Sequence, residues 1–533
     1  MTDLQLHKRI LVADKISPEG KAFLEGQKNI SVDHITGLDE SGLCDKIGGY
    51  DAVIVRSATT ISAKVIDAAG RLQVIGRAGI GVDNIDVGYA TGKGIVVLNT
   101  PDANVTTTAE LTIAHLFSLS RNLPQANRSV KAGEWKRTRF IGVELTNKVL
   151  GIVGYGHIGR VVAAKALALD MQVIAFDPFV TEEKFLADGV TGVGIDELVE
   201  EADYISLHCP LNDKTRNIMN AARLRAMKPG ARLINCARGG LVDEAALYDA
   251  LKDGHLGGAA LDVFSTEPPE ESPLLTLDNI LLTPHLGAST HEAQAATGME
   301  IAQQICIYLR TGEPINAINL PAVSADEMVK LQPYLLLARR LGMLLGPMIT
   351  DSIRQLEVSL LGEAAERDMS SIATEGLVGL LGAHMSAEVN RVNARHIAQQ
   401  QGLSLVEARA GEHPDYHSAV SLSARHGDRT TEVIGTLFNK KHPRLIRIND
   451  YEIEAVLEGH LLVTRHNDQP GVIAAISNLL ARERINISRM QLGIVSGSSK
   501  AVAVIGVSTA LTDALMGELA ETGAINKVMQ VSL

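Results

Sequence analysis

The chain has few residues of the kinds that build crosslinked or membrane-embedded proteins. Only four cysteines occur in 533 residues (Cys44, Cys209, Cys236 and Cys306), and no two of them form a CxxC pair. The sequence therefore indicates neither a disulfide framework nor a zinc site, and it favours a reducing compartment. No window approaches the ~18 continuous apolar residues of a membrane span, and the first residues lack the apolar core of a signal peptide. These absences predict a cytoplasmic protein with no metal site.

An excess of basic charge is also missing. The chain has 50 Lys and Arg against 62 Asp and Glu, which gives a net charge of −12 at pH 7. A negative net charge disfavours non-specific binding to nucleic acid or anionic lipid. We therefore expect neither nucleic acid nor a membrane as a partner. An anionic small-molecule substrate would need arginines placed locally.

The length predicts three or four domains, and the pattern of apolar runs separates them. Through about residue 285, short apolar strands such as ILVAD, AVIVR, YISLHCP and NILLTPH alternate with helix-like segments, which is a parallel α/β pattern. GEPINAINLP, residues 312–321, has the composition of a linker. Beyond it, helical runs mixed with alternating strands predict an α+β unit. Residues 460–533 are predicted to order as strand, helix, strand, strand, helix, strand.

A dinucleotide-binding motif lies in VLGIVGYGHIGR, residues 149–160. Gly154 permits the tight turn after the strand, Gly156 lets the backbone approach a pyrophosphate, and Gly159 lets the helix lie close to the strand. Asp177 ends the next apolar run, VIAFD, where an acid binds the adenosine ribose hydroxyls and repels a 2′-phosphate. A glycine pattern alone is often only a turn. Strand, spacing and terminal acid together predict NAD as cofactor in preference to NADP.

Three residues are candidates for the chemistry of a hydroxy acid dehydrogenase. Arg238 in NCARGG could grip a carboxylate in a two-point fork, although an arginine there could also cap a helix at the surface. His285 follows the strand of NILLTP at the carboxyl end of the sheet, and its reference pKa near 6.5 suits a proton shuttle. With 16 histidines in the chain, an incidental position is the alternative. Glu267 in STEPP could orient the imidazole, or could belong to an ordinary loop.

Five segments in one order, GRAGIGVDNID, GIVGYGHIGR, NCARGG, ALDVFSTEPP and PHLGAST, resemble the D-specific 2-hydroxyacid dehydrogenases. The resemblance covers about residues 9–320 and implies that Arg238, Glu267 and His285 form the catalytic set. It also implies a substrate lobe that closes on a nucleotide lobe across a hinged cleft. The implied cofactor contacts, besides the glycine turn and Asp177, are His157, Ile158, Cys209, Cys236, Asp262, His285, Gly287 and Ala288.

The choice of hydroxy acid depends on basic residues near the expected cleft. Arg56 and Ser57 in IVRSAT, with Arg77 and Gly79 in GRAG, are candidates for substrate binding, against surface ion pairs as the alternative. Arg137 in WKRTRF could reach the phosphate of a substrate bound by a neighbouring subunit. A solvated charged face is the competing interpretation.

The C-terminal half narrows the choice further. HNDQPGVIAAISNLLARERINISRMQLG resembles an ACT domain, in which Asp468, Gly471 and Asn486 would bind a small amino acid, or would merely form turns. The middle unit resembles the allosteric substrate-binding domain of long 3-phosphoglycerate dehydrogenases. This order of units implies NAD-dependent oxidation of D-3-phosphoglycerate to 3-phosphooxypyruvate, the first step of L-serine synthesis, with L-serine as effector and a homodimer or homotetramer.

The predicted fold is therefore α/β, with two Rossmann-like or flavodoxin-like lobes, an α+β intervening domain and a C-terminal βαββαβ ACT domain. Oligomerisation alone is the alternative role for the last two units. Rival functions are a hydroxypyruvate, glyoxylate or 2-oxoglutarate reductase of the same family, and a non-catalytic NAD-sensing protein. The predicted boundaries are 1–103 with 286–320 for the substrate lobe, 104–285 for the nucleotide lobe, 321–456 for the intervening domain and 457–533 for the ACT domain.

Overall fold

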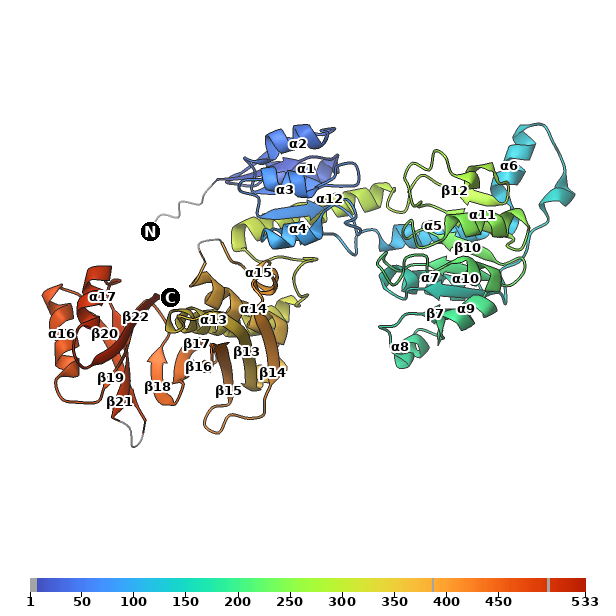
Figure 1. Ribbon diagram of the computed structural model, residues 1–533. Coiled ribbons are helices and arrows are strands. Elements are labelled where there is room, and N and C mark those ends of the chain that lie inside the picture. The colour runs from blue at the N-terminus through green and yellow to red at the C-terminus, as the bar shows by residue number, and fades with distance from the viewer. Residues whose placement is uncertain (1–6, 386–387, 496–498) are drawn as a thin grey trace.

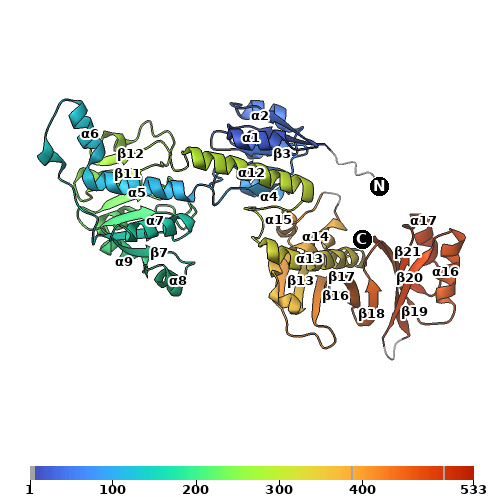
Figure 2. The same ribbon diagram turned by 180° about the vertical axis from the view of Figure 1, so that it is seen from behind.

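The computed structural model describes residues 7–385, 388–495 and 499–533, which form four β-sheets (Figure 1). Two parallel sheets make two lobes that stand side by side. The other two sheets lie on the side of the first lobe, away from the second (Figures 1 and 2). None of the helices in the described ranges has the length and apolar character needed to cross a bilayer.

The first lobe is built on a five-stranded parallel sheet of order β2-β1-β3-β4-β5. One face is covered by α2, α3 and α4, and the other by α1 and by α12, which returns from the second lobe. Its elements are β1 (Lys8–Val12), α1 (Pro18–Glu25), β2 (Ile30–His34), α2 (Glu40–Ile47), β3 (Ala52–Val55), α3 (Ala63–Ala68), β4 (Val74–Arg77), α4 (Val87–Gly92), β5 (Val96–Leu98) and α12 (His291–Thr311).

The second lobe has a seven-stranded parallel sheet of order β12-β11-β10-β9-β6-β7-β8. The direction of winding reverses between β6 and β9. Helices α5 and α7 pack on one face, and α9, α10 and α11 on the other. The elements are α5 (Val105–Arg121), α6 (Leu123–Lys131), η1 (Arg137–Phe140), β6 (Val149–Val153), α7 (His157–Leu167), β7 (Gln172–Phe176), α8 (Glu182–Ala187), β8 (Thr191–Gly192), α9 (Ile195–Glu201), β9 (Tyr204–Leu207), α10 (Ala221–Ala226), β10 (Arg232–Asn235), α11 (Glu244–Lys252), β11 (Gly258–Leu261), η2 (Pro273–Thr276) and β12 (Ile280–Leu282).

The middle unit, residues 325–456, has a six-stranded sheet of order β14-β13-β15-β16-β17-β18, antiparallel except for the β13–β14 pair. Helices α13 and α14 pack together against it. Its elements are α13 (Ala325–Leu345), η3 (Gly346–Met348), β13 (Ile353–Gly362), η4 (Glu363–Glu366), α14 (Met369–Gly382), α15 (Ala394–Gln400), β14 (Ser404–Arg409), β15 (Ser418–His426), β16 (Arg429–Phe438), β17 (His442–Ile448) and β18 (Tyr451–Val456).

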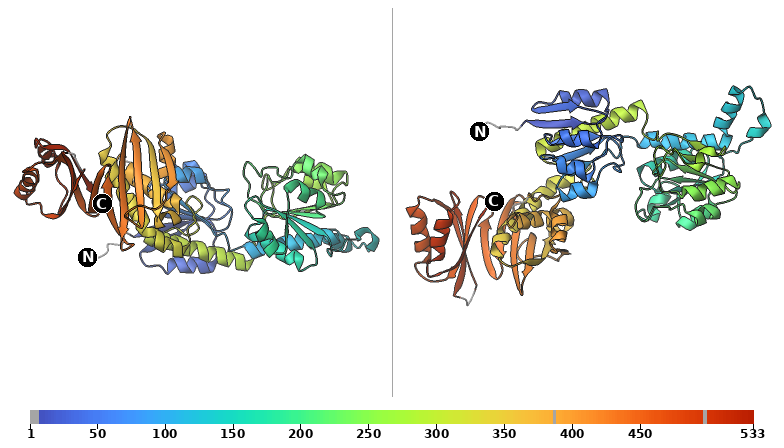
Figure 3. Two further views of the ribbon diagram at one scale, coloured as in Figure 1. Left: turned by 90° about the horizontal axis from the view of Figure 1, so that it is seen from below. Right: turned by 45° about the horizontal axis from the view of Figure 1, so that its top comes forward.

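The C-terminal module is a four-stranded antiparallel sheet of order β20-β21-β19-β22. Helices α16 and α17 cover one face. The other face shares a continuous apolar core with the middle unit, which includes Val463 and Val504 of the module and Leu341 of the middle unit, and Figure 3 shows the two units side by side. The elements are β19 (His460–Asn467), α16 (Val472–Arg482), β20 (Ile487–Ile494), β21 (Lys500–Val507), α17 (Asp513–Ala520) and β22 (Ile525–Ser532).

Local sequence sets where several helices begin. Ser17, Ser62 and Asp243 accept a backbone N–H bond at the starts of α1, α3 and α11, as capping residues do. The predicted α/β fold, with a following α+β unit and a C-terminal βαββαβ module, is confirmed. The predicted domain boundaries all fall between secondary-structure elements. The division of functions among these domains stays a prediction.

Candidate active site

A cavity of about 330 Å³ lies between the two lobes. The first lobe contributes residues that follow β4, among them Ile80, Gly81 and Asp83. The second lobe contributes the carboxyl ends of β6, β9 and β10 and the loop after β12. Ligands of open parallel sheets bind where the winding reverses, outside the carboxyl ends of the strands. The cavity occupies that place in the second lobe, between β6 and β9.

The predicted glycine turn joins β6 to α7 at the floor of this cavity. Gly154 has φ 96°, and a Cβ there would lie 2.7 Å from the backbone N of Cys209. A Cβ on Gly159 would lie 2.3 Å from the Gly154 carbonyl oxygen. Gly156 caps α7 without a side-chain bond, and a Cβ on it would have no neighbour within 4 Å. Free N–H groups at this helix start therefore face open space, which fits the diphosphate of a dinucleotide.

Asp177 lies at the end of β7, next to the turn. One carboxylate oxygen accepts a 2.8 Å bond from the backbone N of Tyr155, and the other a 2.9 Å bond from that of Phe179. The side chain is half-buried. It therefore fixes the turn, and its bonds to ribose hydroxyls stay a prediction.

His285 and Glu267 form the pair that the sequence predicts. Nδ1 of His285 lies 2.8 Å from Oε2 of Glu267, while Oε1 of Glu267 accepts a 3.0 Å bond from the backbone N of Phe264. His285 lines the cavity and has φ 55°, a conformation uncommon for a residue with a side chain. Because the carboxylate engages Nδ1, Nε2 is the ring nitrogen left to exchange a proton with a ligand.

Asp262 holds the loop that carries His285. It is fully buried, and its carboxylate accepts bonds of 2.6 Å from Thr283 Oγ1, 2.7 Å from Leu286 N and 2.8 Å from Gly287 N. Thr283 in turn lies 3.4 Å from Nε2 of the buried His115, whose pKa is lowered by burial. The carboxylate of Asp262 is thus engaged in positioning the loop, and its predicted contact with the cofactor stays a prediction.

Cys209 and Cys236 line the cavity, and their contact with the cofactor stays a prediction. Burial raises the pKa of the Cys209 thiol to about 11 and that of Cys236 to about 12. Both are protonated near neutral pH and are poor nucleophiles. They are packing residues and not reactive thiols.

Arg238 reaches across the cavity to the first lobe. Its Nε lies 2.9 Å from Oδ2 of Asp83, and its Nη1 donates a 2.7 Å bond to the carbonyl oxygen of Ala237. The guanidinium lies so close to Gly81 that a Cβ there would be 1.8 Å from Nη2. The sequence did not single out Asp83, although it lies in the quoted segment GRAGIGVDNID. The alternation of glycine and acid in that segment was the available signal.

Arg77 is the second guanidinium of the cavity. Burial and the nearby Arg238 lower its pKa to about 10, so it remains charged at neutral pH. Gly79, with φ 145°, has no side chain that would collide with Nη1 of Arg77. Two neighbouring guanidiniums suit a ligand with more than one negative charge.

The remaining predicted substrate residues lie outside this lining. Arg56 donates to the carbonyl oxygen of Lys15 and is close enough to Arg77 to affect its pKa, and Ser57 is exposed. Arg137 is exposed on η1, which follows α6 at the end of the second lobe that is far from the first (Figure 1). A single chain therefore does not bring Arg137 to its own cavity.

The predicted regulatory residues lie at two ends of the C-terminal module. β19 and β20 both run antiparallel to β21, so they point the same way. Asp468 follows the end of β19, near Gly471 at the start of α16, whereas Asn486 precedes the start of β20. Asp468 and Asn486 thus lie at opposite ends of the strands, separated by the length of β21. Their predicted role in binding an amino acid stays a prediction.

These features define a class of protein: dinucleotide-dependent dehydrogenases of D-2-hydroxy acids. Residues 113–287 match the D-isomer specific 2-hydroxyacid dehydrogenase, NAD binding domain, and residues 330–449 match the D-3-phosphoglycerate dehydrogenase intervening domain. NAD is the cofactor.

Within that class the chain belongs to the D-3-phosphoglycerate dehydrogenase family. It is 40% identical to the D-3-phosphoglycerate dehydrogenase of Methanocaldococcus jannaschii over 98% of this chain and 100% of that one. A solved structure from Thermus thermophilus superposes with a TM-score of 0.55 at 34% identity, covering 58% of this chain and 99% of that chain. The Aquifex aeolicus D-lactate dehydrogenase, solved with NAD and lactic acid, superposes with a TM-score of 0.54 at 27% identity, covering 59% of this chain and 100% of that chain.

Proposed function

We propose that the protein oxidises D-3-phosphoglycerate to 3-phosphooxypyruvate with NAD, the first step of L-serine synthesis. The observation that carries the proposal is that His285, whose ring is bound by Glu267, lines one cavity with Arg238 and Arg77. The match to a relative of that name over its entire length supports the choice of substrate.

The chemistry follows from the side chains. Arg238 binds the substrate carboxylate in exchange for Asp83, because a guanidinium matches a carboxylate in two parallel bonds. Nε2 of His285 takes the proton of the C2 hydroxyl, and Glu267 stabilises the imidazolium that results. When bound, NAD supplies the acceptor for the hydride that leaves C2. Proton and hydride leave the same H–C–O–H unit, and a carbonyl forms.

A homo-oligomer is part of the proposal. Several large apolar side chains are exposed on α5, on α6 and on the segment after α6: Trp135 at 77% and Ile141 at 78% exposure, with Phe117, Leu123 and Val130. Exposed apolar side chains on neighbouring segments favour an interface, and most homo-oligomers are symmetric dimers or multiples of them. In a dimer formed through this surface, Arg137 on η1 would lie at the interface, from which it would reach the phosphate of a substrate bound by the neighbouring chain.

L-serine as effector is the regulatory part of the proposal. The separation of Asp468 from Asn486 within one module supports an amino acid site shared by two paired modules. We also propose a cytoplasmic location, which the four free thiols support.

Steady-state rates test the proposal. The full-length protein should reduce NAD with D-3-phosphoglycerate far faster than with D-glycerate, and L-serine should lower the rate. Equal rates with the two acids would instead indicate a reductase of unphosphorylated acids. No NADH from any 2-hydroxy acid, despite NAD binding, would indicate a non-catalytic NAD-binding protein.

A further inference from the structure

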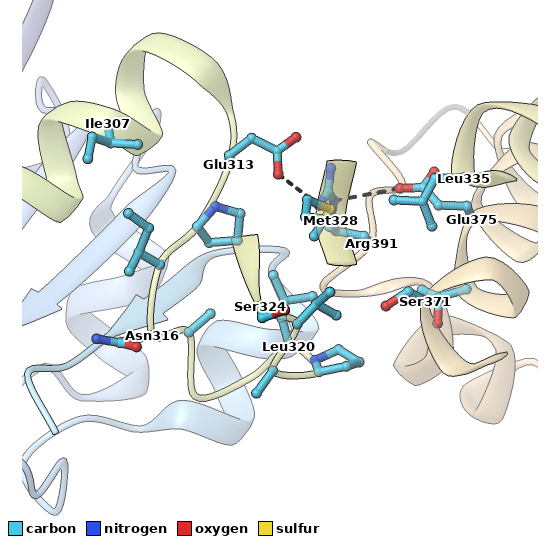
Figure 4. Close-up of a pocket in the computed structure, with 17 residues that line it drawn as sticks. Ile307, Glu313, Asn316, Leu320, Ser324, Met328, Leu335, Ser371, Glu375 and Arg391 are labelled. Atoms are coloured by element: carbon cyan, nitrogen blue, oxygen red, sulfur yellow. Dashed lines mark ion pairs between the residues drawn. The ribbon is translucent and has the colours of Figure 1, made fainter. Parts of the chain in front are cut away.

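A second cavity, of about 670 Å³, lies where the first lobe joins the middle unit (Figure 4). Its walls come from the linker after α12, from α13 and α14, and from Arg391. It shares no lining residue with the cavity between the lobes. Its volume falls in the range of small-molecule sites, about 300 to 1,000 Å³.

Most of the wall is apolar. The side chains come from the last turn of α12, the linker and α13, and they include Ile307, Leu320, Val323, Met328 and Leu335. An apolar wall of this kind favours a ligand with an apolar body, since its burial removes that surface from water.

One end of the cavity is charged. Figure 4 shows Arg391 between two carboxylates, with Nη1 4.0 Å from Oε2 of Glu313 and Nε 3.6 Å from Oε1 of Glu375. Both distances exceed those of a hydrogen bond, so neither contact uses the N–H groups fully. Glu375 is only 5% exposed, and its other oxygen lies 2.8 Å from Nε of Arg339.

This arrangement of charge selects the ligand. The two carboxylates and two guanidiniums cancel, so a ligand with a net charge would meet a like charge beside the opposite one. An anion bound to Arg391 would lie close to Glu313, and a cation bound to Glu313 would lie close to Arg391. A molecule that carries an ammonium and a carboxylate side by side complements both residues.

We propose that this cavity is a binding site for an α-amino acid with a large apolar side chain. The carboxylate pairs with Arg391, the ammonium with Glu313, and the side chain lies among the apolar residues of α12, the linker and α13. The volume accommodates a bicyclic side chain, for which L-tryptophan is the probe.

The site lies at a structural junction. Val392, next to Arg391, is buried in the core of the first lobe, and Asn390 Nδ2 donates a 3.0 Å bond to the carbonyl oxygen of Gly94. Helix α12 runs from just after the His285 loop to Ile307 in the cavity wall. An occupant contacts the linker and the middle unit together and therefore stabilises their junction.

Calorimetric titration of the full-length protein with L-tryptophan tests the proposal. We expect one site per chain and a higher melting temperature in its presence. Tryptamine lacks the carboxylate and indole-3-propionate lacks the ammonium, so each should bind about tenfold or more weakly. L-serine lacks the apolar body and should not displace L-tryptophan.

Variants locate the site. Arg391→Gln should weaken L-tryptophan binding about tenfold or more, whereas Arg354→Gln, an exposed arginine on β13, should not change it. Ala322→Phe fills the cavity from an exposed position and should weaken binding with every charge retained. The proposal is overturned if L-tryptophan gives no heat at millimolar concentration, or if neither variant weakens binding. It is equally overturned if Asp468→Asn removes the heat, because the C-terminal module would then hold the ligand.

Discussion

Each lobe has its own parallel sheet in which the direction of winding reverses once, but the two lobes offer different groups to an anion at the reversal. In the second lobe, the N–H groups at the start of α7 are open at the reversal between β6 and β9. In the first lobe, the reversal lies between β1 and β3, and there the buried carboxylate of Asp14 accepts bonds from the backbone N of Arg56 and Thr59. An anion must then bind to side chains. The same architecture therefore leaves a helix start open in one lobe and places a carboxylate at the corresponding reversal in the other, so loop residues decide which ligand each lobe can bind.

The largest effect is expected from Arg238→Ala, which removes an arginine of the second lobe that reaches across the cavity to the first lobe. We expect kcat/KM to fall about 10³-fold, or about 4 kcal/mol, because two charge-assisted bonds to the substrate carboxylate are lost. NAD affinity should change little. Arg225→Ala, which removes an exposed arginine paired with Asp253 in the same lobe, should leave both unchanged. A variant with normal turnover would remove Arg238 from the catalytic set.

Asp14→Ala tests whether an internal carboxylate replaces a ligand in the first lobe. Three bonds are lost, from Arg56 N, Thr59 N and Thr59 Oγ1. We expect the first lobe to lose about 3 kcal/mol of stability. The calorimetric transition should move to lower temperature, and KM for the acid should rise. Asp39→Ala removes an exposed helix cap of the same lobe and should cost only about 1 kcal/mol.

Gly156→Val tests whether the N–H groups at the start of α7 in the second lobe bind the cofactor. A valine side chain would project into the open space at the start of α7, so KM for NAD should rise about 100-fold while the protein stays folded. Gly194→Val is the matched control, since Gly194 caps α9 and also has no neighbour within 4 Å of a Cβ. Equal effects of the two changes on NAD would show that capping, not close approach, matters at Gly156.

Asp177→Asn tests cofactor choice. The amide keeps an acceptor for a backbone N–H group but loses the negative charge that repels a 2′-phosphate. The preference for NAD over NADP should fall about tenfold, measured as the ratio of kcat/KM values. Asp196→Asn, an exposed acid on α9, should leave the ratio unchanged.

The smallest expected effect concerns pH. Burial holds the pKa of His115 below its usual value, so the unfolded chain takes up the proton at higher pH than the folded one. The free energy of unfolding is therefore unaffected by the titration of His115 above about pH 6.5 and declines as the pH falls below that value. His115→Gln has no imidazole at this position and does not lose this stability as the pH falls. The difference in melting temperature between the variant and the unmodified protein should therefore shrink by about 2 °C between pH 8 and pH 5.5. A constant difference would contradict the assignment.

Sequence patterns found the second lobe more completely than the middle unit. The strands around Val153 and Leu207 are buried on both faces, so they appear as continuous apolar runs. In the middle unit, β14 and β17 mix charged and apolar residues, as in SLVEAR and HPRLIRI, and were not singled out. The short β2 of the first lobe is half-buried throughout, with a weak pattern for the same reason.

Sequence alone determined the glycine turn and the order of the units. Spacing within one strand, turn and helix fixes the glycine turn, because neighbours in the chain form it. Arg238, Glu267 and His285 were predicted as a catalytic set from the resemblance of their segments to a dehydrogenase family, and that role stays a prediction. Only the tertiary structure decided that Asp83 engages Arg238, that Asp262 holds the His285 loop, and that Arg391 lies between Glu313 and Glu375. Each of these contacts joins residues far apart in the sequence or on different elements, and packing, not local pattern, brings them together.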